Sequence, residues 1–191
     1  ETVEASASVD IDPERVDLLL PEDFELPPGG LNIRWPDSPM EQEKRLINFK
    51  WYAALAYIRR NRLNRAVIDS PKAWFGIVTA GKAYVDTTQA LAELGLDRET
   101  CERLGIRVFK CDVVWPLESS SIQAFADGLD EILVVEEKRQ MLEYQIKEEL
   151  YHLPDGKRPH VYGKFDERDG RVGEWAMPRG QWLLPAHGEL S

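Results

Sequence analysis

Short apolar runs alternate with helical patterns after residue 66, and this alternation restricts the possible folds more than any other feature of the chain. The runs are short enough for strands buried in a parallel sheet, and they span residues 75–79, 106–109 and 131–135. A helical pattern follows each run, over 83–94, from Pro116 onward and over 138–151. The order predicts a three-layer α/β fold with a mostly parallel sheet, and one further strand is expected near 160–163.

Charge is spread unevenly along the 191 residues, whose formal net charge is −10. Residues 1–25 hold nine acidic side chains and one basic one, so they carry −8 of that charge, whereas residues 44–65 hold seven basic side chains and no acidic one. These two segments predict ion pairing, either within the chain or between domains. The overall acidity argues against a nucleic-acid or anionic-membrane partner, and no apolar stretch approaches the roughly 20 residues of a membrane span.

The first 37 residues are rich in proline and glycine, which predicts an irregular acidic connector. Ser38, Pro39 and Glu41 then form the pattern of a capping box, so a helix is expected to begin there. Two apolar stripes run along this helix, which therefore needs partners on two sides, and its cations favour docking onto an acidic partner.

The resulting division of the chain has four parts: a connector (1–37), a two-sided apolar and basic helix (38–65), an α/β domain (66–165) and a turn-rich connector to a following domain (166–191). The chain begins with Glu-Thr-Val and ends in a loop-like sequence, so we expect a part of a longer polypeptide.

One stretch matches the phosphate-binding loop signature in all but its last position, from Gly76 to Ala83. Ala83 cannot ligate magnesium, and Gly76 sits inside an expected strand rather than after it, so we do not expect nucleotide hydrolysis. The milder interpretation is that Thr79, Gly81 and Lys82 lie at a strand end and a helix N-terminus, where they could hold an anion or a carboxylate.

Glu136 and Glu137 directly follow the apolar run at 131–135, at the sheet edge where open α/β folds bind ligands. Paired carboxylates could perform acid/base chemistry if the pKa of one of them were raised. A structural or interface salt bridge, for example with Lys82, is the favoured interpretation, because ion-pair networks resemble functional clusters.

No metal site is expected from this chain alone, because Cys101 and Cys111 lack the spacing of zinc or iron–sulfur ligands. We expect both cysteines to be reduced and the protein to be cytoplasmic. The three histidines have no partners at metal-binding spacing, and the serines at 119–121 are better explained as helix caps than as nucleophiles.

Several motifs together resemble the indolepyruvate ferredoxin oxidoreductase family: GIVTAGKAYVD (76–86), WPLE (115–118) and EILVVEEKR (131–139), with PGGLNIR (28–34) and GKFDE (163–167) in support. The chain is similar to the middle of the long fused bacterial form. The resemblance implies a transketolase C-terminal-like domain. It also implies a parent enzyme that decarboxylates 2-oxoacids on thiamine diphosphate and magnesium, passes electrons through iron–sulfur clusters to ferredoxin, and forms acyl-coenzyme A.

This chain lacks the Gly-Asp-Gly start of a thiamine diphosphate motif and lacks cysteine clusters, so the resemblance implies no cofactor within it. We therefore expect a structural or interface domain that is inactive by itself. The implied partners are other domains of the same polypeptide, a second copy in a homodimer, and ferredoxin. The alternatives are a stand-alone anion- or nucleotide-binding α/β module and a pure oligomerisation module.

Overall fold

The computed structural model describes residues 8, 10–15, 17–32, 34–166 and 182–190. The first regular element is a short 3-10 turn, Pro13–Arg15. The longer elements are, in chain order, α1 (Pro39–Arg45), a π-helical turn (Leu46–Lys50), α2 (Trp51–Arg60), β1 (Asn64–Ile68), β2 (Phe75–Ala80), α3 (Lys82–Glu93), α4 (Arg98–Leu104), β3 (Ile106–Cys111), α5 (Ser119–Ala126), β4 (Glu131–Val135), α6 (Leu142–Leu150) and β5 (His160–Tyr162).

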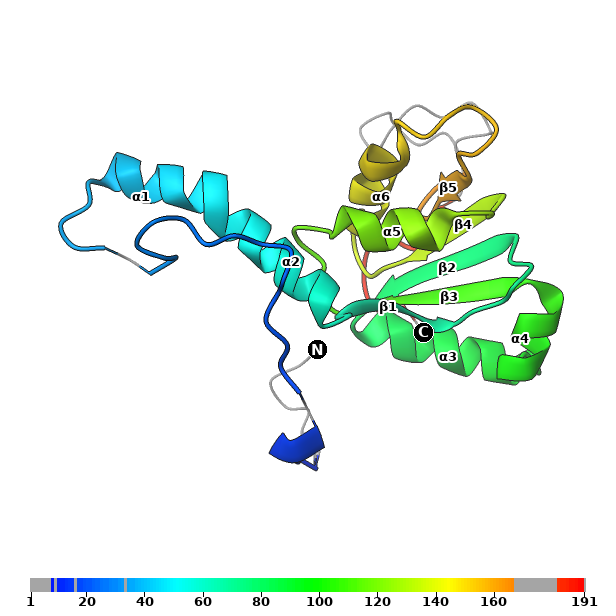
Figure 1. Ribbon diagram of the computed structural model, residues 1–191. Helices are drawn as coiled ribbons and strands as arrows, with labels where there is room; N and C mark the ends of the chain where they lie inside the picture. Colours follow the sequence, from blue (N-terminus) through cyan, green and yellow to red (C-terminus); the bar gives the residue numbers. More distant parts are fainter. Residues whose placement is uncertain (1–7, 9, 16, 33, 167–181, 191) are drawn as a thin grey trace.

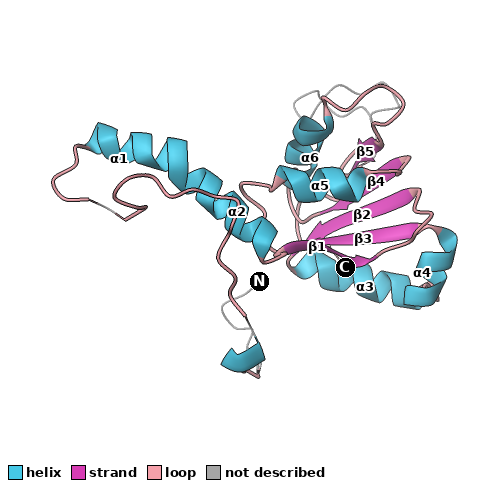
Figure 2. Ribbon diagram, in the orientation of Figure 1, coloured by secondary structure: helices cyan, strands magenta, loops and turns pink. Residues whose placement is uncertain are grey.

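The strands form one five-stranded sheet in the order β1-β3-β2-β4-β5. The four strands β3, β2, β4 and β5 are parallel to one another. β1 lies at the edge and pairs with β3 in the antiparallel direction. Helices α5 and α6 cover one face of the sheet, and α3 and α4 cover the other (Figures 1 and 2). The expected three-layer, mostly parallel α/β fold is confirmed.

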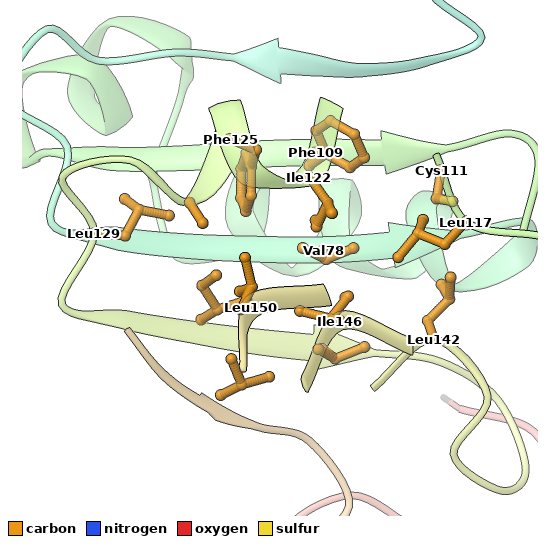
Figure 3. Close-up of a cluster of buried hydrophobic side chains, with 14 residues drawn as sticks. Val78, Phe109, Cys111, Leu117, Ile122, Phe125, Leu129, Leu142, Ile146 and Leu150 are labelled. Carbon is orange, nitrogen blue, oxygen red and sulfur yellow. The ribbon is translucent and has the colours of Figure 1, made fainter. Parts of the chain in front are cut away.

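Two apolar cores lie on the two faces of the sheet, because successive residues of a strand point to opposite sides. Val78 and Phe109 face α5 and α6, where they pack with Ile122 and Ile146 in the larger core (Figure 3). The smaller core on the other face contains four buried residues: Ile77, Leu91, Cys101 and Val108. Burial on both faces explains why β2 reads as a continuous apolar run.

The strands expected at 75–79, 106–109, 131–135 and near 160–163 are all present. The helix expected from Pro116 begins instead at Ser119, and the helix expected over 138–151 begins at Leu142. In both cases a glutamate side chain accepts hydrogen bonds from the first backbone N–H groups of the helix and fixes a later start, Glu118 for α5 and Glu136 for α6.

The sequence did not predict β1 or α4. β1 is a short edge strand whose side chains, including Arg65, are largely accessible, so it lacks the apolar run of the buried strands. α4 covers seven residues between its N-cap Asp97 and a left-handed Gly105. That length is too short for a helical period to stand out.

The expected capping box is present at the start of α1, where Ser38 Oγ accepts from the Glu41 amide and Glu41 accepts from the Ser38 amide. Helix α1, the π-helical turn and α2 follow one another as a rod that extends away from the sheet (Figure 1). The rod ends at Arg60, before the end of the expected range 38–65, because Asn61 leaves the helical conformation.

The acidic N-terminal connector pairs with the end of this rod. Arg59 binds the carboxylate of Asp23, and Arg60 Nη2 lies 2.8 Å from Glu22 Oε1. Asn61 exchanges two hydrogen bonds with the backbone of Leu19, at 2.8 and 2.9 Å. Of the two pairings that the charge pattern allowed, the structure shows the one within the chain.

Most of the C-terminal connector expected over 166–191 lies outside the described residues, which resume at 182. Its boundaries, like those of the other three parts, stay predictions. Among the described helices, none combines the length and apolar character that a membrane span requires.

Candidate functional site

The carboxyl ends of β2 and β4 lie beside each other at one edge of the sheet, because Thr79 pairs in register with Val135. Four of the five candidate residues from the sequence line one hollow of about 390 Å³ there: Gly81, Lys82, Glu136 and Glu137. Thr79, the fifth, is fully buried within β2. Gly81 has a φ of 55°, in the left-handed region that favours glycine, and it turns the chain from β2 into α3.

Glu136 caps helix α6 with both of its carboxylate oxygens. Oε2 accepts from the amides of Met141 and Leu142 at 2.9 Å, and Oε1 accepts from the amide of Glu143 at 3.1 Å. Burial raises the pKa of Glu136 above its ordinary value, although these three N–H groups oppose the shift. Its acceptor sites are directed at the helix terminus, so this carboxylate serves the fold.

Lys82 is held by groups of its own chain. Its Nζ lies 2.9 Å from Asp86 Oδ2 and 3.9 Å from Glu137 Oε1, and it donates to the carbonyl oxygen of Leu190 at 2.9 Å. The hydrogen bond with Asp86 raises the pKa of Lys82, so the ammonium stays charged. The salt bridge between Lys82 and a neighbouring carboxylate is present, and the positive charge of Lys82 is already balanced.

Lys164 belongs to the same edge, although the sequence did not single it out. It follows β5 and is fully buried, with its Nζ donating to the carbonyl oxygens of Glu136 and, at 2.8 Å, Pro185. Burial lowers the pKa of Lys164. The one local feature of the sequence that points to this packing is the preceding residue, Gly163. An added Cβ there would lie 2.6 Å from Glu143 Oε2, so only glycine allows the backbone to approach the Glu143 carboxylate this closely.

Residues 182–190, the C-terminal segment, fold back onto this edge of the sheet. Three lysines donate to backbone carbonyl oxygens of the segment: Lys164 to Pro185, Lys138 to Gly188 and Lys82 to Leu190. Trp182 packs on Phe165, with 4.2 Å between ring centroids. The carboxyl edge, where open α/β sheets usually bind ligands, is therefore partly closed by the chain itself.

Three buried oxygens near this edge have no hydrogen-bond partner among the described residues: Thr79 Oγ1, Glu137 Oε1 and Gln140 Oε1. The Glu137 oxygen still lies within ion-pair distance of Lys82, but it is too far for a hydrogen bond. Because two carboxylates and one neutralised lysine line the hollow, an anionic ligand would be repelled there. The arrangement suits a structural role better than anion binding or acid/base chemistry.

Potential metal ligands are scattered over the described residues. They contain no group of three or more His, Cys, Asp or Glu side chains placed to hold a metal. Cys101 and Cys111 lie in different cores on opposite faces of the sheet. Burial raises the pKa of the Cys111 thiol to about 12, which leaves it protonated and unreactive at neutral pH.

Comparison with known proteins identifies a matching family and several similar proteins. A family model described as "Indolepyruvate ferredoxin oxidoreductase middle domain" matches residues 64–191. Indolepyruvate oxidoreductase subunit IorA of Pyrococcus abyssi is 27% identical over 135 residues, which cover 69% of this chain and 19% of that protein. The corresponding subunit of Pyrococcus horikoshii is 31% identical over 150 residues, which cover 62% of this chain and 22% of that protein.

The chain thus spans about a fifth of the length of these curated relatives. Among solved structures, it is similar to 2-oxoglutarate:ferredoxin oxidoreductase from Magnetococcus marinus, with a TM-score of 0.41 and 15% sequence identity. That similarity covers 73% of this chain and 22% of the other.

Proposed function

Because this chain belongs to the indolepyruvate ferredoxin oxidoreductase middle-domain family, we propose that it is a non-catalytic structural domain of a 2-oxoacid:ferredoxin oxidoreductase. Its role is to orient the catalytic domains of the full-length enzyme through its surfaces. The family match covers the whole α/β body, from β1 onward, and so applies to the part of the chain that contains the sheet edge.

One observation carries the proposal: two titratable groups at the carboxyl edge, Glu136 and Lys82, bind groups of their own chain. Glu136 caps α6, and Lys82 binds Asp86 and the C-terminal segment. A general acid or base needs a group within hydrogen-bond reach of a substrate, and these groups are turned toward their own chain. Chemistry at this edge would require them to be released first.

The reaction proposed for the full-length enzyme is oxidative decarboxylation of a 2-oxoacid to an acyl-coenzyme A, with ferredoxin as electron acceptor. This chemistry uses thiamine diphosphate, magnesium and iron–sulfur clusters. The described residues contain no group of three or more His, Cys, Asp or Glu side chains placed to hold a metal, so we assign these cofactors to other domains. We further propose a homodimeric, cytoplasmic enzyme; two free buried cysteines support a reducing compartment.

Lys82→Ala in the full-length enzyme tests the structural role of this edge. We expect assembly or the affinity for the acyl acceptor to change more than the rate of decarboxylation, because Lys82 holds the C-terminal segment rather than the reacting atoms. Decarboxylation by single turnover, coenzyme A titration and light scattering measure the three effects. A fall in decarboxylation of about 100-fold or more, the size expected for a lost acid/base group, would overturn the proposal.

The alternative is a stand-alone anion- or nucleotide-binding module, which the hollow at the sheet edge and the unpartnered Thr79 Oγ1 favour. Calorimetry of the 191-residue chain with thiamine diphosphate, coenzyme A and ATP separates the two functions. We expect no tight binding, because Glu136 and Glu137 repel anions. Tight binding of ATP or thiamine diphosphate would favour the alternative.

A further inference from the structure

The helical rod of residues 39–60, called the arm below, has one apolar stripe that the chain itself covers in part. Arg45 Nη1 donates to the carbonyl oxygens of Pro28, at 3.3 Å, and Gly30, at 2.7 Å. Phe49 lies on this side of the arm and lines a hollow together with Pro27 and Pro28. The N-terminal connector therefore supplies one of the two partners that the arm needs.

The second stripe, which ends at the buried Ile58, is open over its first part. We call this part, with two exposed neighbours, the open face: Ile47, Trp51 and Ala54 of the stripe, together with Met40 and Trp115. Met40 is 79% exposed and Ile47 is 52% exposed. Trp51 contacts Trp115 edge to face, with 4.9 Å between ring centroids, and Trp115 is itself 58% exposed. The open face therefore runs from the arm onto the α/β body through the contact between Trp51 and Trp115.

The arm needs a further contact because it gains little from its own packing. Neither α1 nor the π-helical turn contains a buried residue. Helical stability in proteins comes mainly from packing an apolar face, and a helix of this kind, roughly 30 Å long at about 1.5 Å per residue, is marginal without it. Exposed apolar strips rimmed by charge mark interaction sites.

The charges beside the open face indicate an acidic partner. Lys50 stands three residues after Ile47, and Lys44 three residues before it, although Lys44 also lines the hollow beside Glu41 and Phe49 on the covered side. Neither lysine forms an ion pair with any residue in the described part of the chain, and the sequence from 44 to 65 contains no acidic residue. A partner with carboxylates around an apolar groove would complement both features.

We propose that the open face of the arm docks into another domain of the full-length protein, in an apolar groove rimmed by carboxylates. This inference rests on the proposed function. The matched relatives are about five times as long as the part that this chain covers. A full-length protein of this kind therefore contains further domains onto which the arm can dock. The arm also precedes the family match, which begins at residue 64, and so lies outside the α/β body that the family model describes.

A second copy of the chain fits this surface less well. In a symmetric pair of antiparallel arms that cross at Ile47, each contact occurs twice, and Lys44 of one arm meets Lys50 of the other. Like charges at such positions are destabilising, and the acidic residues of the arm, Glu41 and Glu43, both lie before Lys44. The two lysines therefore favour a different, acidic surface.

Hydrogen exchange of residues 39–58 tests the docking, with the 191-residue chain compared to the product of the complete gene. In the full-length protein we expect exchange in the arm to be at least tenfold slower. Ile47→Glu should abolish this protection, whereas Asn48→Glu, which adds the same charge at the adjacent exposed position, should retain it. Both variants should leave the unfolding free energy of the 191-residue chain nearly unchanged, because neither side chain is buried.

Equal exchange in the two proteins, or equal loss of protection in both variants, would overturn the proposal. Protection that rises with the concentration of the 191-residue chain would instead assign the surface to a second copy. A complete gene that encodes no domain beyond the 191-residue chain would also refute the docking proposal. Assaying 2-oxoacid oxidation on the same samples keeps the two proposals apart, because a protected arm in an inactive protein contradicts only the proposed function.

Discussion

Glu118 is a buried carboxylate that joins the α/β body to the arm. Its side chain accepts from the amides of Ser120 and Ser121, at 3.2 and 2.7 Å, and from Arg59 Nη1 at 2.9 Å. Burial opposes the ionisation of this carboxyl, but the hydrogen bonds from Ser121 and Arg59 outweigh burial and hold the pKa of Glu118 below its ordinary value. The ionised form is therefore favoured by folding.

Glu118→Gln is expected to lower the unfolding free energy at pH 7 by about 1–3 kcal/mol, the usual range for hydrogen bonds to a buried charge. The sign of the pH dependence follows from the lowered pKa. The contribution is complete above the ordinary value of 4.5 and is lost as the pH falls through the lower value of the folded state. Wild-type protein should thus lose more stability than the variant when the pH is reduced below 4.5.

Urea unfolding at pH 7 and at several pH values below 4.5 measures both effects. Glu22→Gln is the matched control, because Glu22 pairs with Arg60 through a carboxylate that is 82% exposed. That substitution should change stability little. Parallel pH curves for wild type and Glu118→Gln would contradict the assignment of Glu118.

At the residue scale, the sequence predicted the members of the sheet edge that follow an apolar run. The proximity of Lys82 and Glu137 could be predicted from the sequence, because the carboxyl ends of neighbouring parallel strands meet at one edge of the sheet. The position of Lys164 at this edge could not be predicted, because the residue lies in a turn-rich region without periodicity. Its burial depends on Pro185 and the C-terminal segment, which are close only after folding.

Strand β2 and helix α5 approach each other closely at Gly76. This residue is also the first glycine of the stretch that resembles a phosphate-binding loop. The residue lies inside β2, so the pattern contains no loop at this point. An added Cβ would lie 2.6 Å from Leu129 Cδ1 and 2.8 Å from Phe125 Cζ, both in the larger core. Packing, rather than phosphate binding, explains this glycine.

Gly76→Ala is expected to destabilise the chain by about 1–3 kcal/mol, the usual cost of overpacking a core. The cost should be reduced by Leu129→Ala, which removes the methyl group nearest the new Cβ. Chemical denaturation of the wild type, the two single variants and the double variant forms a double-mutant cycle. If Gly76→Ala is neutral, or if the two substitutions are simply additive, this contact does not restrict residue 76.

At the element scale, prediction succeeded where a signal was local. The apolar runs predicted β2, β3 and β4, and the capping box predicted the start of α1. The starts of α5 and α6 were wrong because Glu118 and Glu136, each a residue that folding buries, act as the caps. β1 was missed because it is an edge strand with largely accessible side chains and so lacks the apolar run that marks the other strands.

At the scale of the whole molecule, the uneven charge distribution becomes an attachment between the N-terminal connector and the arm. The connector contacts the end of α2 through two charged pairs, Asp23 with Arg59 and Glu22 with Arg60, and through the amide of Asn61. The Asp23, Glu22 and Arg60 side chains are largely exposed, so salt should screen the charged contacts. The hydrogen bonds of Asn61 are neutral and should respond less.

Exchange of the Leu19 amide, which donates to Asn61 Oδ1 at 2.8 Å, reports this attachment at a single residue. We expect its exchange rate by NMR to rise severalfold as potassium chloride is raised from about 0.05 M to about 1 M, because screening shortens the range of the charged contacts from roughly 14 Å to 3 Å. The double variant Glu22→Gln and Asp23→Asn should exchange faster at low salt and lose the salt dependence. Slower exchange at high salt would show instead that apolar contacts hold the connector, since salting-out strengthens those contacts.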